Sequence, residues 1–287
     1  MRPTRVGTDS VASADGPAQR DVIRARGAAV RFGERVLWRD VDLDVGPGTF
    51  TAILGPNGVG KSTLLKVFLG IQPLAAGSVT VLGSPAGAMR RQIGYVPQRR
   101  GFDRSLRIRG SDVVRLGLDG GRWGVPLPGR RTRRGRQAVN EVVRLVGASH
   151  YAGRPIGELS GGEQQRLVVA QALVRNPDLL LLDEPLDNLD LANQAAVAHL
   201  VQRICREQSV TVVMVAHDVN PILPYLDTVV YLAQGQAVIG APKEVITTET
   251  LSALYGSPVE VLRASDGRLV VVGTPEPPAL HSDRHAG

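Results

Sequence analysis

The stretch Gly55-Pro56-Asn57-Gly58-Val59-Gly60-Lys61-Ser62-Thr63 decides the fold of this chain, because it matches the phosphate-binding pattern G-x-x-x-x-G-K-[ST]. The short apolar run 50–54 before it predicts a buried strand, and residues 61–69 after it lack Gly and Pro and predict a helix. The glycines let several backbone N–H groups point at one anion, and the helix start adds its dipole. Strand, loop and helix together predict a site for a nucleoside triphosphate.

Two side chains of this loop have expected roles. Lys61 would reach the β- and γ-phosphates, and Ser62 would hold Mg²⁺. The alternative is a chance glycine-rich turn, which the full nine-residue match in its proper context disfavours. The loop leaves open what the nucleotide is used for.

The composition of the 287-residue chain is that of an ordinary folded protein with a basic balance. Hydrophobic residues make up 43%, charged residues 21%, and the formal net charge is +7. Such a balance is compatible with nucleic acid, an anionic membrane surface or an acidic partner, and selects none of them. The length is enough for one large domain or two small ones.

Several absences in the sequence bear on its compartment. Cys205 is the only cysteine, so no internal disulfide can form and a reducing compartment is expected. No run approaches the roughly 20 apolar residues that span a bilayer, and the N-terminus lacks the apolar core of a secretory signal. We therefore expect a cytosolic location, free or bound peripherally to a membrane.

The two ends of the chain differ from its middle in composition. Residues 1–21 carry almost no large apolar side chains and are expected to form a disordered arm. Residues 22–45 predict short strands with turns at 33–34 and 46–48. Residues 259–262 and 269–272 predict a terminal hairpin. A disordered tail follows, in which His281 and His285 offer a less favoured metal site.

The middle of the chain is rich in arginine. Residues 112–118 and 137–146 predict helices. We expect a solvated loop or a helix start between them. A nucleic-acid surface is the alternative, although only Trp123 offers a stacking face there. The arginines of this segment are Arg122, Arg130, Arg131, Arg133, Arg134 and Arg136.

A second predicted anion site lies further along the chain, in the segment Leu159-Ser160-Gly161-Gly162-Glu163-Gln164-Gln165-Arg166. The Ser-Gly-Gly start of a helix that continues to Arg175 has the features of such a site. One phosphate chain rarely needs two helix starts in one protein. This second site is therefore expected to serve a nucleotide held by another copy.

Two carboxylates follow a run of four leucines at 179–182, which predicts a strand buried on both faces. Asp183 and Glu184 lose hydration at its carboxyl end, which costs free energy unless they have a role. We expect Asp183 to bind Mg²⁺ through water and Glu184 to act as general base toward the attacking water. A structural pair at a strand end is the disfavoured alternative.

Gln98 and His217 end two further predicted strands, 93–96 and 210–216. Gln98 would place an amide where Mg²⁺ and the attacking water lie, although such a residue alone is more often part of a surface loop. His217 is expected to contact the γ-phosphate, because ligands bind at the carboxyl edge of parallel sheets. A lone histidine is otherwise usually structural.

The order and spacing of these motifs resemble those of the ATP-binding subunits of ABC transporters, over roughly residues 22–262. The segment 159–166 is the most specific part of the resemblance. The resemblance implies an α/β fold with a phosphate-loop NTPase core of mostly parallel strands, an N-terminal antiparallel β subdomain and an inserted α-helical subdomain at about 99–165. Residues 263–287 would form the C-terminal hairpin and disordered tail.

The resemblance also implies ATP and Mg²⁺ as cofactors and a head-to-tail dimer with two ATP molecules at its interface. It implies integral membrane permease subunits that dock on the helical subdomain, an extracytoplasmic substrate-binding protein as an indirect partner, and a peripheral location on the cytoplasmic face of the membrane. Gln98 and Asp183 join Ser62 as expected magnesium ligands. Besides the phosphate loop, the residues expected at the nucleotide are Phe32, Ser160, Gly161, Gly162, Glu163 and Asp190.

Within this family the chain is most similar to the group that imports zinc, manganese or iron, and zinc or manganese is the expected cargo. Three features depart from the pattern of the family. Phe32 stands where a tyrosine is commoner, and residues 187–188 are an unusual lead into Leu189-Asp190. The arginine-rich segment 122–136 has no counterpart that we can name. Another solute, such as iron-siderophore, is an alternative cargo. A soluble ATPase acting on nucleic acid is disfavoured, because long coiled-coil arms, zinc-binding Cys pairs and a second cassette are missing from the sequence. The stretches that carry the similarity are 103–106 with 113–114, 217–220, and 240–247 with Leu251 and 255–256.

Overall fold

The computed structural model describes residues 21–98, 101–119 and 130–273. The predicted arm before Asp21, the tail with His281 and His285, and the segment with Arg122 and Trp123 lie outside these ranges. Within them, none of the helices combines the length and the apolar character that a membrane crossing requires.

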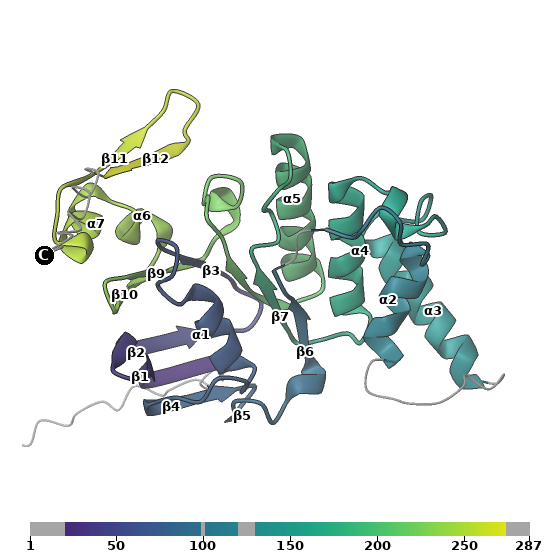
Figure 1. The fold of residues 1–287 in the computed structure, drawn as a ribbon, viewed down its shortest axis with the longest axis horizontal. Helices are drawn as coiled ribbons and strands as arrows, with labels where there is room; N and C mark the ends of the chain where they lie inside the picture. The colour runs from purple at the N-terminus through teal and green to yellow at the C-terminus, as the bar shows by residue number, and fades with distance from the viewer. Residues whose placement is uncertain (1–20, 99–100, 120–129, 274–287) are drawn as a thin grey trace, which may run out of the picture.

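The main sheet has six strands, and five of them run parallel as predicted (Figure 1). The edge strand β10 pairs antiparallel with β9. Strands β3, β7 and β8 are buried along their whole length, which is why their sequences are apolar on both faces. The order is β10 (Gln236–Gly240), β9 (Thr228–Ala233), β3 (Phe50–Leu54), β8 (Thr211–Val215), β7 (Leu179–Asp183) and β6 (Ile93–Val96).

A second, antiparallel sheet is formed by the N-terminal part of the chain, as the resemblance implied. Its order is β2 (Arg35–Val45), β1 (Ile23–Phe32), β4 (Ala76–Val81) and β5 (Ser84–Pro85). The predicted turn at 33–34 is correct, but the prediction of short strands is wrong. The pairing of β1 with β2 shifts register between residues 25 and 31, and Gly27 in this region has φ 51°. These irregularities let β1 continue as one long strand although its in-and-out alternation of side chains is interrupted.

Helices cover both faces of the main sheet and divide its side chains between two cores. Leu179 and Leu181 of β7 face the core that contains α1 (Lys61–Phe68) and the antiparallel sheet. Leu180 and Leu182 face the core that contains α4 (Gly161–Leu173) and α5 (Leu191–Glu207). The remaining helices are α2 (Gly110–Asp119), α3 (Arg130–Leu145), α6 (Pro242–Val245) and α7 (Thr248–Tyr255), with single turns at Arg90–Gln92, Ile156–Glu158 and Leu223–Tyr225.

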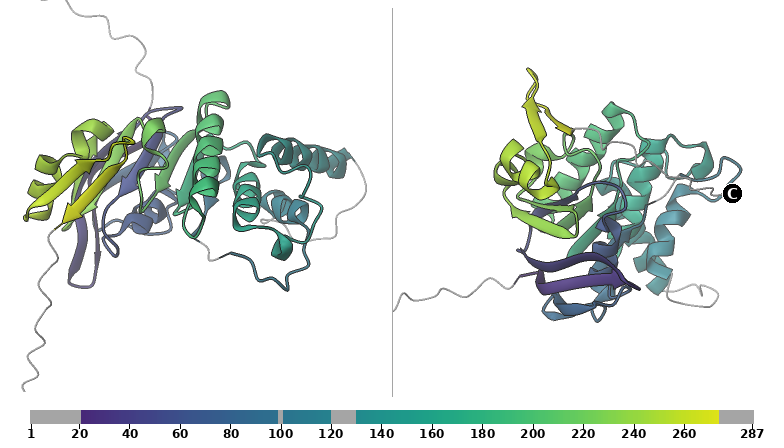
Figure 2. Two further views of the ribbon diagram at one scale, coloured as in Figure 1. Left: turned by 90° about the horizontal axis from the view of Figure 1, so that it is seen from above. Right: turned by 60° about the vertical axis from the view of Figure 1, so that its left-hand side comes forward.

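Helices α2, α3 and α4 form the helical subdomain at one end of the molecule (Figures 1 and 2). Helix α3 begins seven residues before the predicted start, so the loop prediction for the arginines from Arg130 to Arg136 is wrong and the helix-start alternative is correct. Arginine is a good helix former. The described arginines Arg133, Arg134 and Arg136 are exposed, whereas Val139, Val142, Val143 and Val146 are buried.

The predicted C-terminal hairpin is present as β11 (Val259–Arg263) and β12 (Leu269–Gly273), paired antiparallel. It lies at the end opposite the helical subdomain (Figure 2). The Ser252 hydroxyl of α7 donates to the Val259 carbonyl oxygen and accepts from the Val259 N–H, at 2.9 Å each, which attaches the hairpin to α7. A two-stranded hairpin alone is marginally stable, so it depends on such attachments.

Candidate nucleotide-binding and catalytic site

The phosphate loop follows a path that its glycines make possible. It connects β3 to α1 through Gly55, Pro56, Asn57, Gly58, Val59 and Gly60, and Lys61, Ser62 and Thr63 form the first turn of α1. Gly55 has φ 136°, and a Cβ there would lie 2.0 Å from the Leu232 carbonyl oxygen. Gly58 and Gly60 also have positive φ, 78° and 99°. Only glycine adopts such angles without strain.

Lys61 places a positive charge inside this loop. Its Nζ donates to the carbonyl oxygens of Gly55 at 2.8 Å and Pro56 at 2.9 Å, and the residue is buried. Burial lowers the pKa of the ammonium group, and the charges of Glu184 and Asp183 oppose that shift. An anion bound by the loop would therefore meet a partly desolvated cation.

Asp183, at the end of β7, reaches the helix that follows the loop. Its Oδ1 accepts a hydrogen bond from the Ser62 hydroxyl at 2.8 Å. Burial raises the pKa of Asp183, and the Ser62 hydroxyl is the largest opposing influence. A hydroxyl and a carboxylate in contact are oxygen donors of the kind that Mg²⁺ prefers, so the residues fit the expected ion.

Tyr95 is a site residue that the sequence reasoning missed. It lies on β6 beside β7, and its hydroxyl interacts with the Asp183 carboxylate. Burial, with the Asp183 charge, raises the pKa of Tyr95 to about 12. The strand 93–96 was predicted, but only its pairing with β7 shows that Tyr95 faces this carboxylate.

Glu184 follows Asp183 with φ 52°, an angle that costs a non-glycine residue free energy and directs its side chain. Its side chain is 6% exposed, and Oε1 accepts from His217 Nε2 at 2.7 Å. Gln98 Nε2 donates to the other carboxylate oxygen. Burial raises the pKa of Glu184, His217 opposes the shift, and Asp187 adds to it. The chain thus brings Gln98, Glu184 and His217 together from the ends of three adjacent strands.

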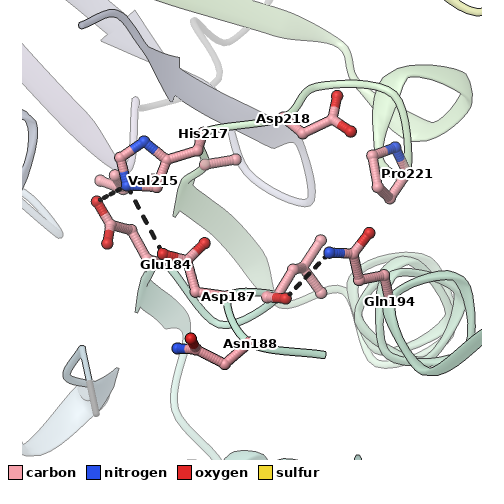
Figure 3. Close-up of a pocket in the computed structure, with 10 residues that line it drawn as sticks. Glu184, Asp187, Asn188, Gln194, Val215, His217, Asp218 and Pro221 are labelled. Carbon is pink, nitrogen blue, oxygen red and sulfur yellow. Dashed lines mark hydrogen bonds and ion pairs between the residues drawn. The ribbon is translucent and has the colours of Figure 1, made fainter. Parts of the chain in front are cut away.

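A cavity of about 260 Å³ lies beside this group (Figure 3). Glu184, Asp187 and His217 line it, and the second carboxylate, Asp187 Oδ2, lies 3.6 Å from His217 Nε2. The sequence marked Asp187 only as an unusual residue, and its position next to His217 follows from the turn after β7.

The second predicted anion site is at the start of α4. Ser160 caps this helix: its hydroxyl accepts from Glu163 N at 3.3 Å, and the Glu163 carboxylate accepts from Ser160 N at 2.8 Å. A Cβ at Gly162 would meet Asn193 Oδ1 at 2.1 Å, so a larger residue there would have to displace the Asn193 side chain. Helix α4 and helix α1 pack on opposite faces of the main sheet. The structure therefore does not bring Ser160 to the phosphate loop of the same chain.

Two other residues expected at the nucleotide have defined positions. Asp190 caps α5, accepting from the Asn193 backbone N–H and side-chain amide at 2.8 Å each, and these bonds lower the pKa of Asp190. Phe32 ends β1 with 51% of its surface exposed, which leaves its ring available for stacking. Contact of either residue with a nucleotide stays a prediction.

Comparisons with known proteins agree with this geometry. A family profile described as ABC transporter matches residues 38–187. The zinc transport system ATP-binding protein TroB of Treponema pallidum (strain Nichols) is 40% identical over 222 residues, covering 77% of this chain and 81% of that protein. The manganese transport system ATP-binding protein MntB of Listeria innocua is 33% identical over 231 residues, covering 80% and 95%.

Two solved structures are similar as well. An inward-facing metal-chelate type ABC transporter is 27% identical, with a TM-score of 0.73 and coverage of 91% of this chain and 100% of that one. A dimeric ATP-binding cassette bound to ADP and phosphate after hydrolysis is 26% identical, with a TM-score of 0.63 and coverage of 76% and 98%.

The raised pKa of Glu184 predicts a pH-dependent stability difference. A carboxyl whose folded-state pKa is raised stabilises the fold fully below its unfolded pKa, about 4.3, and loses that contribution as pH rises through the folded value. Glu184→Gln should therefore raise the melting temperature of the nucleotide-free protein at pH 7.5, with the difference vanishing near pH 4. Glu260→Gln, at an exposed position on β11, is the control and should show no such change. A lower melting temperature for Glu184→Gln at pH 7.5 would contradict this prediction.

The glycine geometry predicts an order of stability. Gly55→Ala and Gly58→Ala both place a Cβ at positive φ, which costs about 1–2 kcal/mol, but only Gly55→Ala drives it against Leu232. Overpacking of this kind adds about 1–3 kcal/mol. Urea unfolding should therefore show a greater loss for Gly55→Ala, and equal losses would show that the β9 backbone yields freely.

Proposed function

The chain belongs to the ABC transporter family of ATP-binding proteins, and we propose that it hydrolyses ATP to power the import of a divalent metal cation, zinc or manganese, through a membrane permease. The observation that carries the ATPase part is the convergence of Gln98, Glu184 and His217 beside the phosphate loop. The similarity to zinc and manganese transport proteins supports the cargo.

The site suggests how these residues act on ATP. Lys61 and the loop N–H groups would hold the phosphates. Ser62, with Asp183 through water and Gln98, would hold Mg²⁺, which neutralises phosphate charge when bound. Glu184 would take the proton of the attacking water, helped by the raised pKa that burial gives it. His217 would leave Glu184 and donate to the γ-phosphate.

A second copy is needed to complete each site in this proposal. The N–H groups at Gly161 and Gly162 start a helix that packs away from the phosphate loop of its own chain. A head-to-tail dimer would bring them to the nucleotide of the partner, where a helix start attracts phosphate. The solved dimeric cassette with ADP and phosphate supports the formation of a dimer.

The remaining partners are membrane proteins. We expect permease subunits to dock beside the segment after Gln98, where Phe102 and Leu106 pack half-buried against the helical subdomain. The chain would then lie peripherally on the cytoplasmic face of the membrane, with an extracytoplasmic binding protein as indirect partner. Because Gln98 contacts Glu184, docking and ATP state would be coupled through one segment.

Mixing two inactive variants tests the shared sites. Ser160→Arg and Lys61→Ala should each hydrolyse ATP very slowly. A mixed dimer has one site with both lesions and one with neither, so mixing should restore part of the activity. Native mass spectrometry would show whether mixed dimers form. If they form and activity does not return, the two shared sites do not work independently of each other.

Metal content of cells tests the proposed cargo. Deletion of the gene should lower cellular zinc or manganese and impair growth under chelation. The wild-type chain should restore both the metal content and the growth. Glu184→Gln should restore neither, because loss of a general base costs about 10²–10⁴-fold in rate. Unchanged metals with a clear defect in uptake of another solute would reject the metal cargo and keep the transport ATPase.

A further inference from the structure

Three side chains of the types that commonly bind metals converge at the cavity that Glu184 and His217 line. One ligand atom each from Glu184, Asp187 and His217 lies within 4.8 Å of the others. Figure 3 shows the three side chains directed toward one another, whereas Asp218 points away. They come from the end of β7, the turn after it and the end of β8.

Their spacing suits a small transition-metal dication. Tetrahedral zinc has bonds of about 2.0–2.2 Å to nitrogen and oxygen, so its ligand atoms lie about 3.3–3.6 Å apart. The distance from His217 Nε2 to Glu184 Oε1 is 2.7 Å, below that range, and the distance to Asp187 Oδ2 is 3.6 Å, at its upper end. All three ligand atoms lie within 4.8 Å of one another, so small side-chain movements would bring them to one ion.

The ligand types select the metal. One imidazole with two carboxylates suits zinc and its neighbours, whereas Mg²⁺ prefers oxygen ligands and keeps several waters. The fourth position would be open to water from the cavity of about 260 Å³. The His217 and Asp187 side chains are 37% and 32% exposed, so an ion could enter from solvent.

We propose that Glu184, Asp187 and His217 form an inhibitory binding site for a zinc-like dication, with Asp187 as the ligand that completes it. The bound ion would hold Glu184 and His217 close to each other as its ligands. A coordinated carboxylate is a weaker base, and His217 could not turn to the γ-phosphate. The inhibition rests on the proposed ATPase function, whereas the binding of the ion does not. If the cargo is zinc or manganese, imported metal would slow its own import.

Cobalt absorption tests the binding. Nucleotide-free full-length chain in a His281→Ala/His285→Ala background is titrated with Co²⁺, whose visible spectrum reports low-symmetry coordination by nitrogen and oxygen. We expect one saturable site per chain that Zn²⁺ displaces. Asp187→Asn should weaken it by about tenfold or more, because even an outer-shell change costs 10–100-fold.

The matched control is Asp218→Asn. Asp218 lines the same cavity, but its carboxylate accepts hydrogen bonds from Asn220, so the substitution should leave the Co²⁺ titration unchanged. No saturable site, an Asp187→Asn titration equal to that of the parent, or equal weakening by Asp218→Asn would each overturn the proposal.

ATP hydrolysis tests the consequence. At fixed excess Mg–ATP, Zn²⁺ should inhibit the parent, and Asp187→Asn should need about tenfold more Zn²⁺ for half-inhibition, each rate being normalised to the same variant without zinc. Inhibition that is equal in the two proteins would overturn the inhibitory role. A parent that hydrolyses no ATP under any condition would instead refute the proposed function, with the Co²⁺ titration still deciding the site.

Discussion

The burial of two adjacent carboxylates, Asp183 and Glu184, is the constraint on which the site depends. They end a strand that is buried along its whole length, so their charges lose hydration and need compensating partners. Ser62 and Tyr95 serve Asp183, and Gln98 and His217 serve Glu184. Tyr95, Gln98 and His217 lie on or next to β6 and β8, the strands beside β7, whereas Ser62 lies in the first turn of α1. The parallel sheet therefore places three of the compensating groups, and α1 places the fourth.

The second requirement is a loop that can lie close to these charges. At Gly55 the backbone passes so near β9 that no Cβ fits, and Lys61 brings the opposing positive charge under the loop. Strand order and loop shape therefore act together: the sheet fixes the carboxylates, and the glycines fix the cation opposite them.

The sequence predicted the parts of this arrangement that depend on local pattern. The apolar runs at 50–54, 93–96 and 179–182 became strands at those positions, and the motifs named the phosphate loop, Asp183, Glu184 and His217. The predictions that were wrong or missing concern features that depend on tertiary contacts. The arginines before residue 137 continue a helix because the valines that follow are packed in the subdomain, and the bulges of β1 have no pattern of their own. Tyr95 faces Asp183 only because β6 pairs with β7.

The contacts of Glu184 also bear on how the proposed mechanism would begin from this geometry. Its two oxygens accept from Gln98 and His217, which occupies two of the roughly four acceptor sites of a carboxylate. In the proposed mechanism these partners would transfer to the magnesium ion and the phosphates, which would restore their hydrogen bonds elsewhere. The exchange costs little because charge-assisted bonds replace charge-assisted bonds. Asp187 competes in that exchange, since a carboxylate 3.6 Å from His217 attracts the imidazole in the absence of nucleotide. Asp187, the unusual residue of the turn, would therefore act on the histidine that moves in the proposed mechanism.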